Sequence, residues 1–109
     1  MEAVSNFVTV AKVGDVKKGQ VKTFAVNEHH IALCNVEGTY FATQDLCTHD
    51  GGPLGEGELL GDEIECPRHG GRFNVKTGQV TALPPIFPIK TFPVRVEGDE
   101  LQVSLTEGS

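Results

Sequence analysis

Apolar and polar residues alternate along much of this chain with a period of two, the spacing of a half-buried β-strand rather than of a helix. The alternation comes in short runs that are rich in β-branched and aromatic residues. These runs predict strands at Phe7–Ala11, Val21–Val26, Ile31–Val36, Thr39–Thr43, Glu63–Glu65, Arg72–Asn74, Phe92–Glu97 and Leu101–Leu105. Helix has little support anywhere, and its best candidate is a short turn near Lys12–Asp15.

Turn residues punctuate this pattern, and 13 glycines and six prolines in 109 residues favour short strands joined by many turns. The turn pairs between predicted strands are Glu37-Gly38, Gly61-Asp62, Thr77-Gly78 and Gly98-Asp99. Regular short strands with such turns are typical of antiparallel β-sandwiches and barrels. We therefore expect an all-β protein of this kind, folded as one domain over residues 1–109.

Two irregular stretches interrupt the predicted sheet. The segment Asp50–Gly61 is so rich in glycine that we expect no regular element in it. The segment Leu83–Pro88 cannot be a central strand, because its prolines lack the N–H that a strand ladder needs. The sheet is therefore interrupted from about Cys47 to Pro88, and irregular loops on a rigid scaffold are where function usually lies.

Two pairs of potential metal ligands lie in that interrupted region. The first pair is Cys47 and His49, and the second is Cys66 and His69. Glycines follow each pair, and they allow the backbone to turn successive N–H groups toward a negatively charged centre. These glycines are Gly51 and Gly52 in the first loop and Gly70 and Gly71 in the second.

The ligand set leaves two kinds of metal centre to consider. A structural zinc site accepts two cysteines and two histidines. Zinc fingers, however, usually place the two cysteines together and the two histidines together, whereas each loop here contributes one of each. That arrangement suits two irons bridged by sulfide, one bound by both cysteines and the other by both histidines. We favour the [2Fe–2S] cluster and keep the zinc-stabilised binding module as an alternative.

The motifs resemble the Rieske signature. The first runs from Cys47 to Gly52 and reads Cys-Thr-His-Asp-Gly-Gly, and the second runs from Cys66 to Phe73 and reads Cys-Pro-Arg-His-Gly-Gly-Arg-Phe. The whole chain is similar, in length and in strand spacing, to Rieske ferredoxins of bacterial aromatic-ring-hydroxylating oxygenase systems. The resemblance implies a β-sandwich base domain formed by both chain ends, with an inserted cluster-binding subdomain at about residues 45–88. It also implies a proline-containing loop, here Pro84 and Pro85, that shields the cluster.

The resemblance further assigns the ligands and their surroundings. It gives Cys47 and Cys66 to the inner iron and His49 and His69 to the outer iron. Respiratory Rieske proteins carry a disulfide between the loops and hydroxyl groups against the sulfurs. At the matching positions this chain has Gly52, Arg68, Gly71 and Phe73. Fewer donors to sulfur favour a low reduction potential, and we expect little dependence on pH near neutrality.

Charge and composition bear on partners and location. The formal net charge of −6 disfavours nucleic acids and anionic membranes as partners. The sequence has neither a signal-peptide pattern nor an apolar run long enough to span a bilayer. We therefore expect a cytoplasmic protein, monomeric and with reduced cysteines.

A few residues outside the ligand motifs also raise specific expectations. We expect Cys34 to be a buried thiol within a strand, and His29 and His30 to lie in an exposed turn. The acidic stretch is either a solvated face or a docking surface. Its members are Asp50, Glu56, Glu58, Asp62, Glu63 and Glu65.

The size of the chain decides between an enzyme and a carrier. A catalytic Rieske oxygenase needs a second iron, held by two histidines and a carboxylate, but only the adjacent His29 and His30 remain after cluster ligation. The chain is therefore expected to be an electron carrier and not an enzyme. The resemblance implies that it passes electrons from a flavin-dependent NAD(P)H ferredoxin reductase to a terminal Rieske oxygenase of aromatic hydrocarbon catabolism. The alternative is the Rieske small subunit of another redox enzyme, such as assimilatory nitrite reductase.

Partner docking is expected over the exposed edges of the cluster histidines. Because electron tunnelling falls steeply with distance, a partner should approach the iron that lies nearest the surface. The rim around that edge would be of mixed charge. Its predicted members are His49, His69, Arg68, Arg72, Glu56 and Glu58.

Overall fold

The computed structural model describes residues 7–26, 29–45, 54–67, 70–83, 85 and 87–105. In that part of the chain, short strands and one short 3₁₀ helix make up the regular structure. The elements are β1 (Phe7–Lys12), β2 (Val21–Val26), β3 (His29–Val36), β4 (Thr39–Gln44), η1 (Leu54–Glu56), β5 (Glu58–Leu60), β6 (Glu63–Glu65), β7 (Arg72–Asn74), β8 (Val80–Ala82), β9 (Thr91–Phe92), β10 (Val94–Glu97) and β11 (Glu100–Ser104). None of the helices within these ranges is long and apolar enough to cross a membrane.

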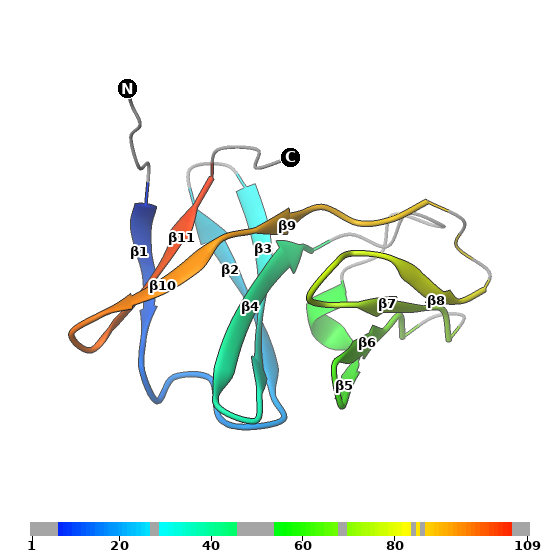
Figure 1. Cartoon of the computed structure of the whole chain (residues 1–109), viewed down its shortest axis with the longest axis horizontal. Coiled ribbons are helices and arrows are strands. Elements are labelled where there is room, and N and C mark those ends of the chain that lie inside the picture. The colour runs from blue at the N-terminus through cyan, green and yellow to red at the C-terminus, as the bar shows by residue number, and fades with distance from the viewer. Residues whose placement is uncertain are drawn as a thin grey trace.

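The described strands form three antiparallel sheets, which confirms the all-β prediction. The first sheet has the order β1-β11-β10 and joins strands from the two ends of the chain. The second has the order β2-β3-β4-β9, and the third has the order β5-β6-β7-β8. The third sheet and η1 lie beyond the second sheet, on the side away from the first (Figure 1).

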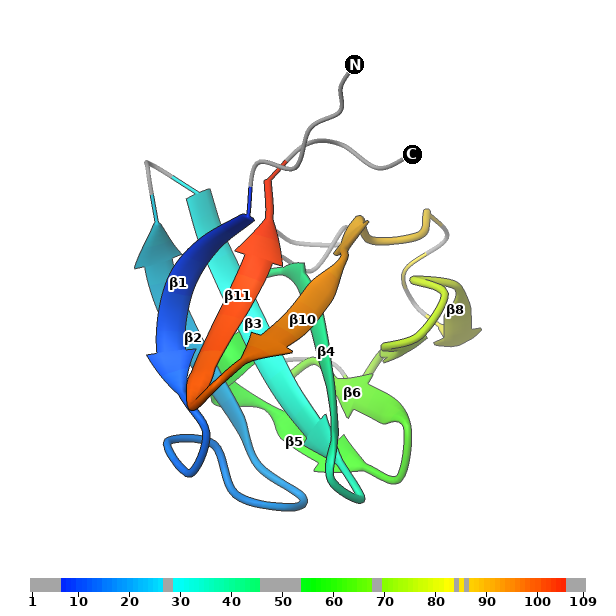
Figure 2. The same cartoon turned by 60° about the vertical axis from the view of Figure 1, so that its left-hand side comes forward.

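The strand β3 separates two apolar cores because its successive side chains point to opposite faces. Ile31 and Leu33 face the core between the first and second sheets, which we call the base core. Ala32 and Cys34 face the core between the second and third sheets, which we call the loop core. All four side chains are fully buried. Figure 2 shows the first sheet lying across one face of the second, where the base core is enclosed.

The hairpin between β3 and β4 shows how turn residues set the register. Val36 pairs with Thr39, so Glu37 and Gly38 form the turn between them. Both have positive φ, 54° and 95°, as a type I′ turn requires. The turn predicted at this pair is confirmed. The turn predicted near Lys12–Asp15 is also present, closed by a hydrogen bond of 2.9 Å from the Asp15 N–H to the Lys12 carbonyl.

The predicted strand Phe92–Glu97 is two strands that belong to different sheets. Phe92 ends β9 in the second sheet, and Val94 begins β10 in the first. Pro93 stands between them and has no N–H to donate to a ladder. Its carbonyl still accepts a hydrogen bond of 2.9 Å from the Ser104 N–H. The chain therefore changes sheets at the proline.

Two other expectations were wrong. His29 and His30 are exposed but belong to β3, where they pair with Val26 and Ala25 instead of forming a turn. The glycine-rich segment Asp50–Gly61 contains η1 and β5 among its described residues. β5 forms because its neighbour β6 supplies a partner strand, and Leu59 packs against the loop core. The short strand β8 was also not predicted, and it forms by pairing with β7.

Candidate metal centre

The second predicted ligand loop, Cys66–Gly71, connects two strands of the third sheet. Glu65 at the end of β6 pairs with Arg72 at the start of β7. Inside this pair, the Cys66 N–H donates to the Gly71 carbonyl at 2.7 Å, and the Gly70 N–H donates to the Cys66 carbonyl at 3.1 Å. Gly70 has φ of 76°, a conformation that glycine adopts without strain. The loop is thus tightly closed around Cys66.

Cys66 is held in the wall of the loop core. It is only 1% exposed and forms no disulfide. Phe73, Ile64 and Leu54, all fully buried, belong to the same core. A buried sulfur meets one requirement of a thiolate ligand to iron, which is little contact with water. The residues described here therefore fit a cysteine ligand at this position.

Ion pairs connect the two sides of the β6–β7 hairpin that carries this loop. The Arg72 guanidinium lies 3.4 Å from a Glu65 carboxylate oxygen and 3.7 Å from one of Glu63. Lys76 lies 3.9 Å from the Asp62 carboxylate. Part of the acidic stretch is therefore paired with cations of the same sheet. The Arg72 side chain pairs with glutamates of the neighbouring strand β6, which weakens the prediction that Arg72 belongs to a docking rim.

The first ligand loop lies between residues that the structure does describe. Asp45 precedes it and Leu54 follows it. The Gly55 N–H donates to Asp45 Oδ1, so one carboxylate joins the two ends of the loop. Leu54 is fully buried in the loop core and anchors the far end. Sequence analysis did not single out Asp45, although an acidic side chain close before a ligand motif was a visible signal.

The proline-containing segment has a buried centre and exposed flanks. Pro85 is fully buried, whereas Leu83 is 73% exposed and Phe87 is 62% exposed. Both are large apolar side chains, and exposed apolar patches are candidates for contact with a partner. The buried position of Pro85 agrees with a shielding role for this segment.

The remaining predicted residues divide between described and undescribed positions. Cys47, His49, His69, Gly51, Gly52, Arg68 and Pro84 lie outside the described residues, as does the side chain of Glu56. Of the four predicted ligands the structure therefore describes Cys66. Glu58 is exposed on β5, and Gly71 is buried.

Cys34 is a buried strand thiol, as predicted. Burial and, to a lesser degree, the negative charge of Asp45 raise its pKa to about 12. A thiol with so high a pKa remains protonated at neutral pH, and it is a poor nucleophile and a poor metal ligand. Its role is to fill space in the loop core.

A groove of about 710 Å³ opens along β4 and the segment that leads into β10. Its walls are mainly apolar and aromatic, and Lys76 lies 5.9 Å from the centre of the Phe41 ring at its edge. The cysteines that the structure describes, Cys34 and Cys66, do not line it.

Comparison with known proteins agrees with this geometry. The Rieske [2Fe-2S] domain family matches residues 6–93. The chain belongs to this family, whose defining group is a Rieske-type [2Fe–2S] cluster.

The relatives narrow the class further. The biphenyl 2,3-dioxygenase ferredoxin component of Rhodococcus jostii strain RHA1 is 41% identical over 99 residues, which cover 91% of this chain and 92% of that protein. The ferredoxin component of the naphthalene 1,2-dioxygenase/salicylate 5-hydroxylase systems of a Ralstonia species is 41% identical over 92% of this chain and 96% of that protein. A chain in the complex of reduced oxygenase and oxidized ferredoxin of carbazole 1,9a-dioxygenase superposes with a TM-score of 0.89, at 34% identity and covering 97% of this chain and 99% of that one.

The alternative of a nitrite reductase small subunit has weaker support. A protein described as such a subunit has a TM-score of 0.76 but only 18% identity over 89% of this chain and 96% of that one. That likeness shows a shared fold and no more. The prediction of an electron carrier of the Rieske ferredoxin type, and not of an enzyme in its own right, is confirmed.

Proposed function

We propose that this chain is the ferredoxin of an aromatic-ring dioxygenase system, and that it passes single electrons from a flavin-dependent NAD(P)H reductase to a terminal Rieske oxygenase. The observation that carries this proposal is the match to ferredoxin components, which covers more than nine-tenths of this chain and of each of the two relatives. One of these relatives belongs to a biphenyl system and the other to a naphthalene system, and each is 41% identical to this chain. The substrate class is therefore aromatic hydrocarbons, without a single preferred ring system.

The proposed ligands are Cys47 and Cys66 for the inner iron and His49 and His69 for the outer iron. When bound, the cluster accepts and releases one electron. The chain itself excludes water from the cysteine side through the loop core, in which Cys66 and Phe73 are buried. The cluster-binding subdomain would occupy about residues 45–88, which includes the third sheet and the buried Pro85.

Docking would take place at the end of this subdomain, over the histidine edges. Leu83 and Phe87 support the proposal, because both are exposed and they flank the buried Pro85. Weak redox complexes bury little surface, and charge at their rims affects the rate of encounter more than the affinity. Glu58 would contribute to such a rim, because it is exposed and pairs with Glu65, the residue directly before Cys66. The protein would act as a cytoplasmic monomer that forms transient contacts.

The first test is the cofactor. Purified protein should contain about two irons and two sulfides per chain and be red-brown in the oxidised state. The reduced protein should show the electron paramagnetic resonance spectrum of a cluster with two histidine ligands. His49→Ala and His69→Ala should each lose the cluster, while His30→Ala, which removes an exposed histidine on β3, should retain it. Stoichiometric zinc without sulfide would contradict the proposal and favour the zinc-stabilised module.

The second test is electron transfer. Stopped-flow mixing with a biphenyl or naphthalene dioxygenase reductase should reduce the protein, and a matching oxygenase should then oxidise it. An assimilatory nitrite reductase large subunit should neither bind it stably nor exchange electrons with it. A stable complex with that subunit would favour the alternative function instead.

A further inference from the structure

The residue Asp45 occupies the point at which the first ligand loop leaves and rejoins the scaffold. It follows β4 directly, and its N–H donates to the His30 carbonyl at 3.0 Å, which fixes its backbone against β3. Residues 46–53 lie between Asp45 and the start of η1 at Leu54. Any group that ties Asp45 to η1 therefore sets the distance between the two ends of this loop.

The Asp45 carboxylate forms this tie with both of its oxygens. Oδ1 accepts the Gly55 N–H from η1. Oδ2 accepts the Thr23 hydroxyl of β2 at 3.0 Å. Hydrogen bonds to an ionised carboxylate are stronger than those between neutral groups, and two of them on one side chain fix its orientation. The carboxylate thus joins β2, the end of β4 and η1 at one point.

Gly55 is required for this arrangement. A side chain added at Gly55 would overlap the Thr23 hydroxyl and approach Asp45 Oδ1 to 3.2 Å. Only a residue without Cβ lets η1 come this close to β2 and to the carboxylate. The tight packing shows that the end of the first loop is built to a fixed position and is not merely tethered.

The same turn reaches the base of the second ligand loop. The Gly57 N–H donates to the Leu54 carbonyl at 2.9 Å, which closes η1. A side chain added at Gly57 would overlap the Glu65 carbonyl, immediately before Cys66. The segment from Gly55 to Gly57 is therefore wedged between the Asp45 carboxylate on one side and the start of the Cys66 loop on the other.

We propose that Asp45 is a positioning residue for the cluster: its carboxylate closes the first ligand loop and, through the Gly55–Gly57 turn, sets the spacing between the two ligand loops. This inference rests on the proposed ligand set. Asp45 lies outside that set, and its effect on the iron would be exerted through the loop ends that it holds together.

The test compares variants that weaken this tie to different degrees. Asp45→Ala removes both acceptors, Asp45→Asn keeps one, and Thr23→Val removes one donor while preserving shape. Asp15→Ala is the matched control, because Asp15 also accepts a backbone N–H, that of Lys12 at 2.9 Å, but at a turn outside the ligand loops. Val103→Ala is the control for general destabilisation, because Val103 is fully buried in the base core.

The readouts are the rate of cluster loss to an iron chelator, the electron paramagnetic resonance spectrum and the thermal unfolding midpoint. Asp45→Ala should accelerate cluster loss about 10-fold and shift the spectrum, as expected when a group that orients ligands is removed. Asp45→Asn and Thr23→Val should give smaller changes of the same kind, and they carry the test if Asp45→Ala does not fold. Asp15→Ala should match the wild type, and Val103→Ala should lower the unfolding midpoint without shifting the spectrum.

Two outcomes would overturn the inference. One is cluster loss and spectra for the Asp45 and Thr23 variants that match those of Asp15→Ala. The other is acceleration that follows the unfolding midpoint alone, as in Val103→Ala, with unchanged spectra. A wild-type chain that binds no iron and sulfide would instead contradict the proposed function, so the two failures are distinguishable.

Discussion

The base core and the loop core share one strand, β3, but they have different tasks. The base core joins residues from the two ends of the chain, such as Ala11 of β1 and Leu101 of β11. The loop core is built mainly from the segment that follows η1, together with the opposite face of β3. Only the loop core contains one of the predicted ligands among its described residues, Cys66. One core therefore joins the two ends of the described chain, and the other holds a predicted ligand of the metal centre.

This division explains why a small domain can carry a cluster on irregular loops. Loops bury little surface of their own, so they need a rigid element to hold them. The loop core supplies this through Leu54 of η1 and Ile64 of β6, which are both fully buried. Mutations in the two cores should consequently separate the stability of the fold from the properties of the cluster.

The largest effect should come from the base core. Leu101→Ala removes a fully buried side chain and should lower the free energy of unfolding by about 2–5 kcal/mol. Denaturant unfolding of the cluster-loaded protein measures this loss. The fraction that remains folded should keep the wild-type reduction potential and spectrum, because Leu101 faces the core without a ligand. A shifted potential in the folded fraction would show that the two cores are not separate.

The buried thiol of the loop core should make stability depend on alkaline pH. The pKa of Cys34 is raised by burial to about 12 from an ordinary value of 9.0. Between these values the folded chain keeps the proton and the unfolded chain releases it, so stability falls as pH rises, by up to about 1.4 kcal/mol per pH unit. Below pH 9 the thiol is protonated in both states, so the free energy that it contributes to folding is constant and fully present.

The matched comparison is Cys34→Ala, which removes the titrating group. Urea unfolding midpoints under reducing conditions, measured from pH 8 to 10.5, should fall less steeply for this variant than for the wild type. The difference between the two slopes cancels the contributions of lysine and tyrosine. Equal slopes would mean that the thiol does not resist ionisation, and that Cys34 is more accessible to water than its full burial indicates.

The elements that sequence analysis recovered and those it missed include strands of one and the same sheet, the third. β2, β6 and β7 were predicted with the observed bounds, because alternation and neighbouring turn residues mark them locally. β5 and β8 have the same length as β6 and β7 but were missed, since β5 lies in a glycine-rich stretch and β8 is followed closely by Pro84 and Pro85. A three-residue strand is therefore recognised from sequence only where the residues around it also favour a strand.

The candidate site was predicted in the same uneven way. Two motifs were enough to propose the ligands, because cysteine and histidine chemistry is visible in the sequence, and of these ligands the structure describes Cys66. The closure of the first loop was not visible, because Asp45 is joined to Thr23 and Gly55, positions far from it along the chain. Contacts of this kind depend on how β2, β4 and η1 come together, which no single stretch of sequence states.

A smaller effect should follow from adding one hydroxyl to the loop core. Phe73 is fully buried in the same core as Cys66 and offers no hydrogen bond. Phe73→Tyr should raise the reduction potential by about 40 mV, since a hydrogen bond to a cluster sulfur is worth about 1 kcal/mol and favours the more negative reduced state. Protein-film voltammetry at pH 7 measures the shift. Phe73→Leu, which adds no donor, is the control and should leave the potential nearly unchanged.

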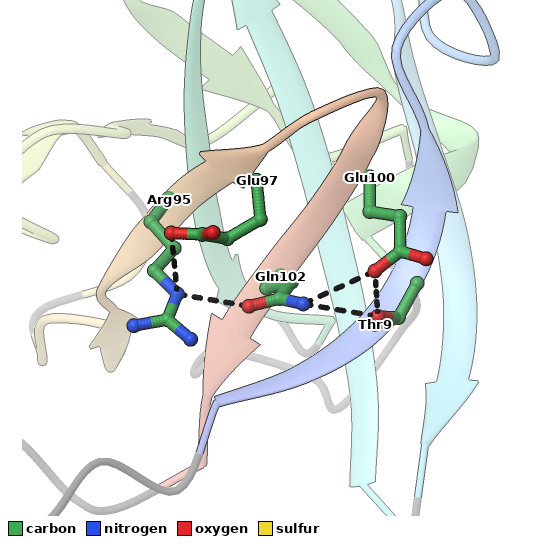
Figure 3. Close-up of polar contacts among 5 residues, drawn as sticks. All are labelled: Thr9, Arg95, Glu97, Glu100 and Gln102. Carbon is green, nitrogen blue, oxygen red and sulfur yellow. Dashed lines mark hydrogen bonds and ion pairs between the residues drawn. The ribbon is translucent and has the colours of Figure 1, made fainter.

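The smallest effects should come from two arginines that form ion pairs with glutamates, Arg95 in the first sheet and Arg72 in the third. Arg95 lies on the outer face of the first sheet, where it contacts Glu97 at 3.8 Å and Gln102 at 2.8 Å (Figure 3). Exposed pairs of this kind contribute little, so Arg95→Ala should lower the free energy of unfolding by less than about 1 kcal/mol and leave the potential unchanged.

Arg72 makes ion pairs of similar length at the base of the Cys66 loop. Arg72→Ala should cost equally little stability, but it leaves the carboxylates of Glu63 and Glu65 without their cation. Two uncompensated negative charges near the cluster disfavour its reduction, so the potential should fall, and the fall should shrink as salt is added. Voltammetry of both variants at low and physiological ionic strength measures the difference. If the two variants shift the potential alike, the charges of the third sheet do not reach the metal centre, and proximity to the loop core has no electrostatic consequence.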